Sequence, residues 1–463
     1  MRIAISAVQF SNDRPIGAKR PRALAQILAE HGHEVTVFTP ATEPHETAPV
    51  PAGITVRELM PYPWSSPVRK RASLWRRALM YALVAGTTPR VVVLSRPALA
   101  RLFGMDEDRR AAAFDAINTR RRLTMERVGS VLDARRWSAQ SAASLTADEA
   151  SGFDAILSTT PPIGSLFFGR FLARRNPRAV WVSDIRDAMV VPGMLSTGRA
   201  ILAAQERRAI REASAITVVS EGVKHSILQQ RVNRPHADRI TVLPNGFMPR
   251  TVTDAAESHT PGPLRIGYTG QIYAEGRDAT PLFRAIHALL GEHAEAQIEV
   301  HYAGNQGHRM IEFAAAFGLE RLVIDHGLMS HADAVALQDG MDLLLVLSWN
   351  RKNSQGIISG KFGEYLASEK PILALVGGDV PHAELTILVR KMNVGHAYEE
   401  SGSAEGHEEL IAFLRHAVAL RASGRPLDYE PVAAERADFD YETIARRFES
   451  LMEMADSPHV AVR

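Results

Sequence analysis

Short apolar, β-prone segments alternate with helical segments along much of this chain, and this alternation limits the possible folds more than any other feature. The first example begins with a strand-like run at 2–8, continues through a helical pattern that ends at Gly32, and returns to a strand-like run at 34–39. A strand, a helix and a second strand form the building unit of a doubly wound parallel sheet. The sequence therefore predicts an α/β fold.

The same alternation occurs in two series, and a segment without periodicity separates them. That segment, 247–263, is rich in Pro, Thr, Ser and Gly, a composition typical of linkers. A chain of 463 residues is also too long for one ordinary core. We predict an N-terminal Rossmann-like domain at 1–248, a C-terminal Rossmann-like domain at 249–435, and a tail at 436–463. Residues 441–454 of the tail form a helix whose apolar side needs a partner surface.

Composition excludes several classes of protein. Hydrophobic residues make up 46% and charged residues 23% of the chain, as in soluble globular proteins. The absence of cysteine excludes structural disulfides and thiolate metal sites, and we expect a cytoplasmic protein. A formal net charge of +2, without clustered aromatic residues, argues against nucleic acid as a partner.

One segment suggests contact with a membrane surface. From Arg69 to Arg77, basic residues flank and interrupt an apolar helical pattern that contains Trp75. Such a helix suits the surface of an anionic membrane, which would place the protein at the inner face of the cell membrane. A domain helix with a solvated arginine face explains the same residues, and no apolar run is long enough to span a bilayer.

Polar residues follow the predicted strands of the first domain. Thr160 follows one strand, and Asp184, Arg186 and Asp187 follow the next. Ligands of open α/β sheets bind at the carboxyl ends of strands, so these side chains are candidates to line a cleft. Arg186 paired with the aspartates is the alternative. Gly17, at the start of the first helix, allows close approach of a ligand to the backbone, although a turn alone also explains it.

The second domain repeats this arrangement. Gly270 and Gln271 follow its first strand, and His326 and Gly327 follow a later one. By the same rule these residues lie at the ligand-binding edge of the second sheet.

The stretch from Ser359 to Glu364 carries the strongest chemical signal. Ser359 is a candidate helix N-cap, Gly360 and Lys361 fall in the first turn, and Glu364 lies one turn further on. The free N–H groups of a helix start, together with a lysine, can hold a diphosphate, and a carboxylate one turn in can bind two ribose hydroxyls. A surface helix with a Lys/Glu pair explains the same residues.

Two Asp-x-Asp triplets are the candidates for a metal site. They lie at 106–108 and 438–440. Paired carboxylates can hold Mg²⁺ or Mn²⁺ for a nucleotide-sugar. Neither triplet follows a convincing buried strand and both have charged surroundings, so we predict no metal site.

The order of these pieces resembles the large retaining glycosyltransferase family 4, whose GT-B architecture has two Rossmann-like domains facing each other across a cleft. The resemblance covers nearly the whole chain and is weakest from 61 to 136. The matching segments are 3–6 with Gly17, 31–37, 218–222, 240–246, 267–270 and 360–367.

The resemblance implies a separate role for each domain, and one position of the family's donor motif differs in this chain. It implies that the C-terminal domain binds a nucleotide-sugar, that the N-terminal domain binds the acceptor, and that the tail helix crosses back to the N-terminal domain. The family's donor motif has two glutamates separated by seven residues. The second matches Glu364, whereas the first falls at Gly356, which has no side chain for that contact with the donor sugar. Asn353, Ser354, Gln355 and backbone amides are the candidates to replace it.

The resemblance also implies which residues act on the leaving group. The family usually has an arginine and a lysine after the first strand of the second domain, whereas segment 270–277 contains only Arg277. Arg277 and Lys361 are therefore the cations expected to stabilise the leaving diphosphate. A retaining front-face mechanism needs no protein nucleophile, and Asp184 or Asp187 is expected to position the acceptor or the donor sugar.

These points predict a retaining, metal-independent glycosyltransferase that needs no cofactor and uses a UDP- or GDP-sugar donor. The expected acceptor is a glycan or lipid-linked hydroxyl in cell-envelope or extracellular polysaccharide synthesis, bound through Thr160 and Arg186. The donor-binding residues are expected to be Gly17, Gly270, Gln271, His326, Gly327, Ser359, Gly360, Lys361 and Glu364. Two alternatives stay open: a nucleotide-sugar epimerase of the same architecture, and a non-catalytic nucleotide-sugar binding protein, which the glycine at 356 favours.

Overall fold

The computed structural model describes most of the chain. The described residues are 1–12, 16–43, 48–63, 85–95, 106–191, 193–250, 260–272, 276–352, 354–402 and 404–454. The basic segment Arg69–Arg77 lies outside them. The chain divides into two compact units, each described here by itself: a first unit of Met1–Val218, Ile227–Thr241 and Glu449–Arg463, and a second unit of Val219–Ser226 and Val242–Phe448.

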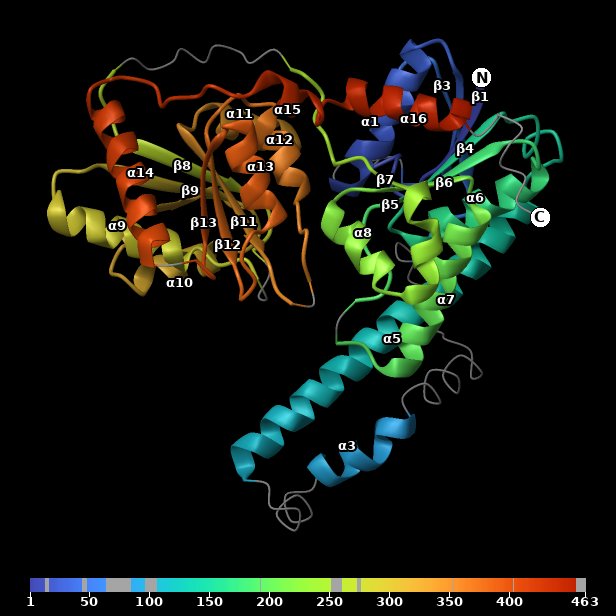
Figure 1. Cartoon of the computed structure of the whole chain (residues 1–463), viewed down its shortest axis with the longest axis horizontal. Coiled ribbons are helices and arrows are strands. Elements are labelled where there is room, and N and C mark those ends of the chain that lie inside the picture. Colours follow the sequence, from blue (N-terminus) through green and yellow to red (C-terminus); the bar gives the residue numbers. More distant parts are fainter. Residues whose placement is uncertain are drawn as a thin grey trace. The chain divides into compact units, whose positions relative to one another are not determined.

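The first unit contains a seven-stranded sheet in the order β3-β2-β1-β4-β5-β6-β7 (Figure 1). The pairings of β1 with β2 and β4, of β2 with β3, and of β5 with β4 and β6 are parallel, as a doubly wound sheet requires. The strands are β1 (Arg2–Ser6), β2 (Glu34–Pro40), β3 (Ile54–Leu59), β4 (Ala155–Thr160), β5 (Val180–Ile185), β6 (Ala215–Val218) and β7 (Ile240–Val242).

Helices cover this sheet. Gly32 ends the first helix at φ +85°, a left-handed conformation in which glycine carries no steric cost. The helical segments are α1 (Ile16–Glu30), η3 (Ala85–Thr87), α3 (Thr88–Ser95), α5 (Glu107–Ala143), α6 (Ile163–Arg175), α7 (Ser196–Glu212) and η4 (Arg231–Arg239). Helix α8 (Glu221–Leu228) falls across the division between the units.

The long helix α5 is the main feature that the sequence reading missed. It runs for 37 residues, from Glu107 to Ala143, and most of it lies in the segment 61–136, where the family resemblance is weakest. Its buried residues all lie between Thr124 and Ser141, and charged residues surround its first half, so the sequence carries no apolar stripe that would reveal a helix. The second half packs on the sheet-bearing part of the unit, where Trp137 is 2% exposed, whereas the first half meets α3, whose Leu94 carbonyl accepts from Arg110 Nη1 at 2.7 Å.

The second unit contains a six-stranded parallel sheet in the order β10-β9-β8-β11-β12-β13. The strands are β8 (Leu264–Thr269), β9 (Ile298–Ala303), β10 (Val323–Asp325), β11 (Leu343–Trp349), β12 (Ile372–Gly377) and β13 (Gly395–Glu399). The helices are α9 (Thr280–Glu292), α10 (Gly307–Ala315), η5 (Glu320–Leu322), α11 (His331–Asp339), α12 (Gly360–Leu366), α13 (Glu384–Met392), α14 (Ala404–Ala422) and α15 (Ala433–Ala437). Two Rossmann-like sheets are therefore present, as predicted.

Both faces of the second sheet are buried. Leu343 and Leu345 of β11 pack into a core with α9, α10 and α14, whereas Leu344 and Val346 pack into the opposite core with α12 and α13. A parallel strand covered on both faces has a continuous apolar run in its sequence, as β11 and β12 do.

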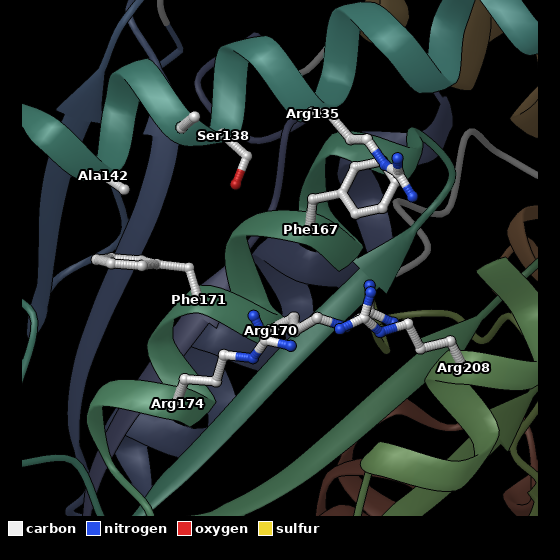
Figure 2. Close-up of a pocket in the computed structure, with 9 residues that line it drawn as sticks. Arg135, Ser138, Ala142, Phe167, Arg170, Phe171, Arg174 and Arg208 are labelled. Carbon is white, nitrogen blue, oxygen red and sulfur yellow. The ribbon is translucent and has the colours of Figure 1, made fainter.

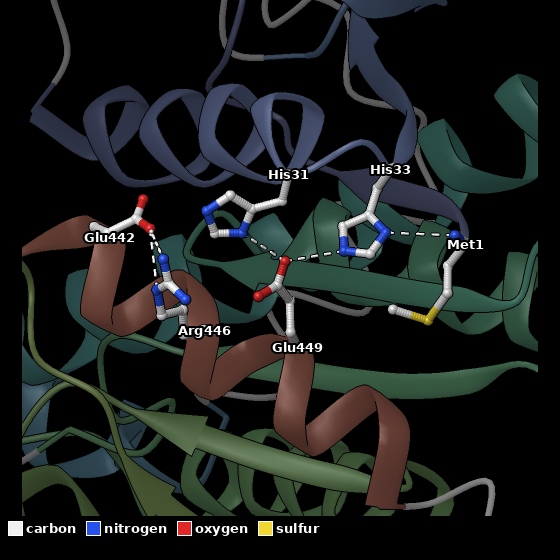
Figure 3. Close-up of polar contacts among 6 residues, drawn as sticks. All are labelled: Met1, His31, His33, Glu442, Arg446 and Glu449. Atoms are coloured by element: carbon white, nitrogen blue, oxygen red, sulfur yellow. Dashed lines mark hydrogen bonds and ion pairs between the residues drawn. The ribbon is translucent and has the colours of Figure 1, made fainter.

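Helix α16 (Tyr441–Met454) has the bounds that the sequence predicted. Its residue Glu449 belongs to the first unit and lies between two histidines at the turn after α1 (Figure 3). Glu449 Oε1 is 2.7 Å from His31 Nδ1 and 2.9 Å from His33 Nε2. One carboxylate oxygen thus joins the end of α16 to the segment between α1 and β2.

No helix within the described residues combines the length and the apolar character that crossing a bilayer requires.

Candidate functional site

The site in the second unit is built around the loop that follows β8. Gly270 in this loop has φ +136°, and a Cβ added there would lie 3.3 Å from Lys361 Cε. A side chain at this position would therefore be strained and would press on the lysine. Glycine lets the aliphatic part of Lys361 lie directly over the loop backbone. Gly270 and Lys361, which are 91 residues apart in sequence, therefore meet here.

Helix α12 orients the two charged side chains of the site. Lys361 Nζ lies 3.2 Å from Glu364 Oε1, and the two side chains are 22% and 10% exposed. Ser359 occupies the N-cap position, as predicted, but its side chain accepts no hydrogen bond from the first turn. Its backbone carbonyl accepts from Phe362 N at 3.0 Å instead.

A buried hydrogen-bond network orients the Glu364 carboxylate from the core side of α12. Gln338 Nε2 donates to Glu364 Oε1 at 2.6 Å and to Thr269 Oγ1 at 2.9 Å. The Tyr365 hydroxyl accepts from Thr269 N at 3.0 Å, and burial raises the pKa of this phenol. Gln338 is fully buried, so its position is fixed by the core. The network sets the direction of the Glu364 carboxylate before any ligand arrives.

Sequence reasoning missed Gln338 and Tyr365. Gln338 lies near the end of α11, in a helix without any motif, and only the tertiary fold brings it to β8 and α12. Tyr365 follows Glu364 directly and reads as a core aromatic residue in sequence. Neither residue carried a signal at the sequence level.

Arg277 also reaches the loop after β8. Its Nη1 donates to the Gln271 carbonyl at 2.6 Å and lies 3.3 Å from the Tyr268 hydroxyl. The guanidinium therefore braces the loop that carries Gly270. The structure thus brings together Gly270, Gln271, Arg277, Lys361 and Glu364.

His326 and Gly327 lie on the same edge of the sheet, after β10. The Gly327 carbonyl accepts from Gly304 N at 2.8 Å, and the Gly270 carbonyl accepts from the Tyr302 hydroxyl at 2.9 Å. His326 Nε2 lies 3.0 Å from His301 Nδ1, and burial together with this second imidazole lowers the pKa of His326. These backbone and side-chain contacts therefore connect the ends of β8, β9 and β10 into one rim.

Gly356, the position of the missing family glutamate, cannot accommodate a side chain. Its φ is +67°, and an added Cβ would lie 2.4 Å from Gly222 Cα. Glu384, at the start of α13, accepts hydrogen bonds from Glu221 N at 2.9 Å and Gly222 N at 3.0 Å. Burial raises the pKa of Glu384. The two glycines pack backbone against backbone, which explains why position 356 is a glycine.

In the first unit, Arg186 links two of the predicted residues. Its Nη1 donates to the Gly17 carbonyl at 2.9 Å, its Nη2 donates to the Pro161 carbonyl, and its backbone N–H donates to the Thr160 carbonyl at 2.7 Å. A Cβ at Gly17 would lie 1.9 Å from Gln9 Oε1. Thr160 Oγ1 is buried and has no hydrogen-bond partner within the described residues.

The two predicted aspartates of the first unit differ sharply. Asp184 is completely buried, and its carboxylate accepts from Arg20 Nε and Nη2, each at 3.0 Å, from Thr159 Oγ1 at 2.9 Å and from Thr217 Oγ1 at 2.7 Å. Asp187 is exposed, and no hydrogen bond or ion pair joins it to another residue in the described part of the chain. Asp187 is the better placed of the two to meet a substrate, and a catalytic role for either stays a prediction.

The Asp-x-Asp triplets have structural partners. Asp106 is the N-cap of α5 and accepts from Arg109 N at 2.8 Å, where acidic residues favour the helix start. Asp438 pairs with Arg447, and Asp440 accepts from Glu442 N at 2.9 Å. Within the described ranges, no three His, Cys, Asp or Glu side chains form a group suited to a metal ion.

Residues 17–246 match the family model described as Glycosyl transferase 4-like domain. The chain carries a glycosyl transferase 4-like domain. A comparison with the sequences of curated proteins found no match. The matched residues include the predicted positions Gly17, Thr160, Asp184, Arg186 and Asp187.

Solved structures show the fold of the whole chain around this glycosyl transferase 4-like domain. Sucrose-phosphate synthase from Thermosynechococcus elongatus is 15% identical, with a TM-score of 0.56 over 98% of both chains. The α,α-trehalose 6-phosphate synthase from Burkholderia multivorans is 12% identical, with a TM-score of 0.53 over 98% of both chains. The lipopolysaccharide outer core galactosyltransferase WaaB is 12% identical, with a TM-score of 0.52 over 98% of this chain and 99% of its own. The predicted GT-B fold is confirmed, and residues 17–246 carry the similarity to glycosyl transferases.

Proposed function

We propose that this glycosyltransferase moves a sugar from a nucleotide-sugar to a hydroxyl group, with retention of configuration and without a metal ion. The observation that carries the proposal is the Lys361–Glu364 pair on α12, which lies over the Gly270 backbone. Glu364 is 10% exposed and already oriented by Gln338. A carboxylate oriented in this way can bind the two hydroxyls of a ribose.

The positive charges suit a diphosphate. Lys361 Nζ is partly exposed next to the glycine loop, and Arg277 braces the same loop through the Gln271 carbonyl. A leaving nucleoside diphosphate gains negative charge as the bond to the sugar breaks. Fixed cations stabilise that charge without reorganisation, which makes a divalent ion unnecessary. Helix α12 adds the N–H groups of its first turn.

Gly356 occupies the position at which the family has a second glutamate that binds the donor sugar. Ser354 and Gln355 precede Gly356, and we propose that this segment contributes backbone or side-chain contacts instead. The His326–Gly327 segment completes the same rim from the side of β10.

For the acceptor, we propose the first unit, with Thr160, Arg186 and Asp187 at the carboxyl ends of β4 and β5. Thr160 Oγ1 retains its full hydrogen-bonding capacity, and Asp187 is exposed. We propose a glycan or lipid-linked acceptor in polysaccharide synthesis, in the cytoplasm. WaaB, by its name, acts on the lipopolysaccharide core. The two synthases, by their names, make sugar phosphates, so the assay includes sugar phosphates as acceptors.

The test is incubation of the full chain with UDP- and GDP-sugars, with and without these acceptors, while nucleoside diphosphate release is followed. Acceptor-dependent release, unaffected by EDTA, is expected, and the anomeric configuration of the product is read by NMR. Donor turnover without acceptor that yields an epimer would establish the epimerase alternative instead. Binding of a nucleotide-sugar without turnover by any acceptor would indicate the binding protein.

Variants locate the donor site. Glu364→Ala is expected to weaken nucleotide binding about 10- to 100-fold, because hydrogen bonds to a charged group contribute about 1.5–3 kcal/mol. The matched control is Lys391→Ala, which removes an exposed Lys–Glu pair with Glu435 elsewhere on the same unit. Unchanged affinity in folded Glu364→Ala would remove this residue from the ribose site.

A further inference from the structure

A pocket in the first unit is separate from every residue discussed so far. It has a volume of about 330 Å³ and lies among α5, α6 and α7 (Figure 2). The side chains that matter are Arg135 from α5, Phe167, Arg170, Phe171 and Arg174 from α6, and Arg208 from α7. Four of these six residues are arginines.

Arg170 is buried at the centre of this group. The residue is only 6% exposed, and its buried Nη2 has no hydrogen-bond partner within the described residues. Burial, together with the nearby Arg208 and Arg174, lowers the pKa of Arg170 to about 10 against the opposing effect of Glu212. A buried guanidinium N–H without a partner is costly, and a phosphate oxygen within hydrogen-bond distance of it would remove that cost.

The arginines share too few carboxylates to neutralise them. Arg170 Nε lies 2.8 Å and Arg174 Nη2 lies 4.0 Å from Glu212 Oε2, and Arg208 Nε lies 2.5 Å from Glu212 Oε1. The fourth, Arg135, donates to the neutral Gln205 Oε1 at 2.9 Å. One carboxylate therefore serves three guanidinium groups, and the pocket keeps excess positive charge.

Aromatic rings supply an apolar wall beside this charge. The Arg135 guanidinium lies 5.4 Å and that of Arg170 lies 6.0 Å from the centre of the Phe167 ring. Phe171 lies one helical turn further along α6 and faces the pocket (Figure 2). Planar guanidinium groups suit phosphate oxygens, and the rings suit an apolar group attached to that phosphate.

The position in the fold separates this pocket from the proposed transfer site. Helix α6 starts just after Thr160, at the carboxyl end of β4, and the pocket residues lie in its later turns, 167–174. In a parallel βαβ unit the helix runs back along the sheet. The pocket therefore lies away from the strand ends where substrates of such folds bind.

We propose that this pocket binds the phosphate group of an organic phosphate whose apolar part packs on Phe167 and Phe171. The proposal does not depend on the proposed transfer reaction. Two sources share this chemistry: a soluble phosphorylated metabolite and the headgroup of an anionic lipid. Phenyl phosphate, which combines a phosphate with an aromatic ring, is the soluble probe.

The test is titration of the full chain with phenyl phosphate, with hydrogen exchange as the local readout. Slower exchange is expected in segments 167–174 and 204–212, and inorganic phosphate is expected to bind more weakly. Arg174→Gln/Arg208→Gln is expected to weaken binding about tenfold or more. These side chains are 62% and 42% exposed, so the double variant should fold. Arg174→Gln alone should also weaken the binding of phenyl phosphate, by a smaller factor.

Two controls make the result specific. Arg199→Gln changes an exposed arginine on α7 outside the pocket, and Lys361→Ala removes the diphosphate cation of the second unit. Both are expected to leave the protection of 167–174 unchanged. Equal binding by the double variant and the unmodified chain would overturn the proposal.

The lipid arm uses sedimentation with phosphatidylcholine vesicles, with and without phosphatidylglycerol. Sedimentation that requires phosphatidylglycerol and is lost in the double variant identifies a lipid headgroup. Phenyl phosphate binding without vesicle binding identifies a soluble ligand. If neither probe binds in a way that the double variant abolishes, the arginine cluster is a solvated surface and the proposal is wrong.

Discussion

Two carboxylates near strand ends, Asp184 in the first unit and Glu364 in the second, show opposite uses of the same chemical group. Asp184 is fully buried and its oxygens accept from Arg20, Thr159 and Thr217. Glu364 keeps 10% of its side chain exposed and stands beside a lysine that is 22% exposed. A buried carboxylate whose oxygens all accept hydrogen bonds from the protein stabilises the fold. A carboxylate that the protein orients but leaves partly exposed is suited to binding a ligand.

The largest effect is expected from changing the buried carboxylate. Asp184→Asn keeps the shape but leaves the buried Arg20 without its counter-charge, which should lower the free energy of unfolding by about 3–5 kcal/mol. Urea denaturation followed by tryptophan fluorescence measures it. The matched control is Asp187→Asn, an exposed neighbour, expected to change stability by less than about 0.5 kcal/mol. A similar loss in the free energy of unfolding for both variants would contradict the idea that the buried, hydrogen-bonded carboxylate stabilises the fold and the exposed one does not.

A second buried carboxylate, Glu206, shows how burial affects the stability of a carboxylate that forms no ion pair among the described residues. Glu206 is 1% exposed, and burial raises its pKa to about 7 against hydrogen bonds from Met189 N and Gln230. The native state then binds its proton more tightly than the unfolded chain. Stability from this group is present below about pH 4.5 and lost as the pH rises through about 7.

Glu206→Gln is expected to remove this pH dependence, which amounts to about 2.5 kcal/mol between pH 5 and pH 8. The measurement is urea denaturation at both pH values. Glu126→Gln, an exposed change on α5, should leave the pH dependence intact. A Glu206→Gln profile that falls with pH as steeply as that of the unmodified chain would show that another group is responsible.

The second unit lacks a carboxylate at 356, and we expect that one cannot be restored. Gly356→Ala should cost about 2–3 kcal/mol, because the residue has positive φ and its Cβ would meet Gly222. Gly318→Ala separates the two causes: φ there is +69° with no atom within 4 Å of an added Cβ, so it should cost about 1 kcal/mol. Equal losses in thermal denaturation would mean that the backbone conformation alone excludes a side chain at 356.

The sequence predicted the parts of the fold that have a period and failed where the partner is distant. Helix α16 had a recognisable apolar pattern, and its predicted range 441–454 matches the observed bounds. Helix α5 has charges all round its first half, so no periodicity marked it. Lys361 and Glu364 could be named because they share one helical turn. Gln338 and Glu384 could not, since only tertiary packing brings them to their partners.

The smallest change in stability is expected for two glutamates of α16, which compare a largely buried carboxylate with an exposed one on the same helix (Figure 3). The Glu449 side chain is 16% exposed and one of its oxygens meets both His31 and His33. Glu442 pairs with Arg446 in an exposed i,i+4 arrangement, with side chains 40% and 69% exposed. We expect Glu449→Gln to cost about 1 kcal/mol, because it weakens two partly buried hydrogen bonds to a charged group.

Glu442→Gln should cost no more than about 0.5 kcal/mol, because an exposed pair is screened by water and loses side-chain entropy. Hydrogen exchange of the α16 amides gives the local free energy of opening for both variants. Faster exchange confined to residues around 449 would show that the histidines hold the end of the helix on the first unit. Equal effects of the two changes would mean that burial near His31 and His33 adds nothing to an ordinary surface pair.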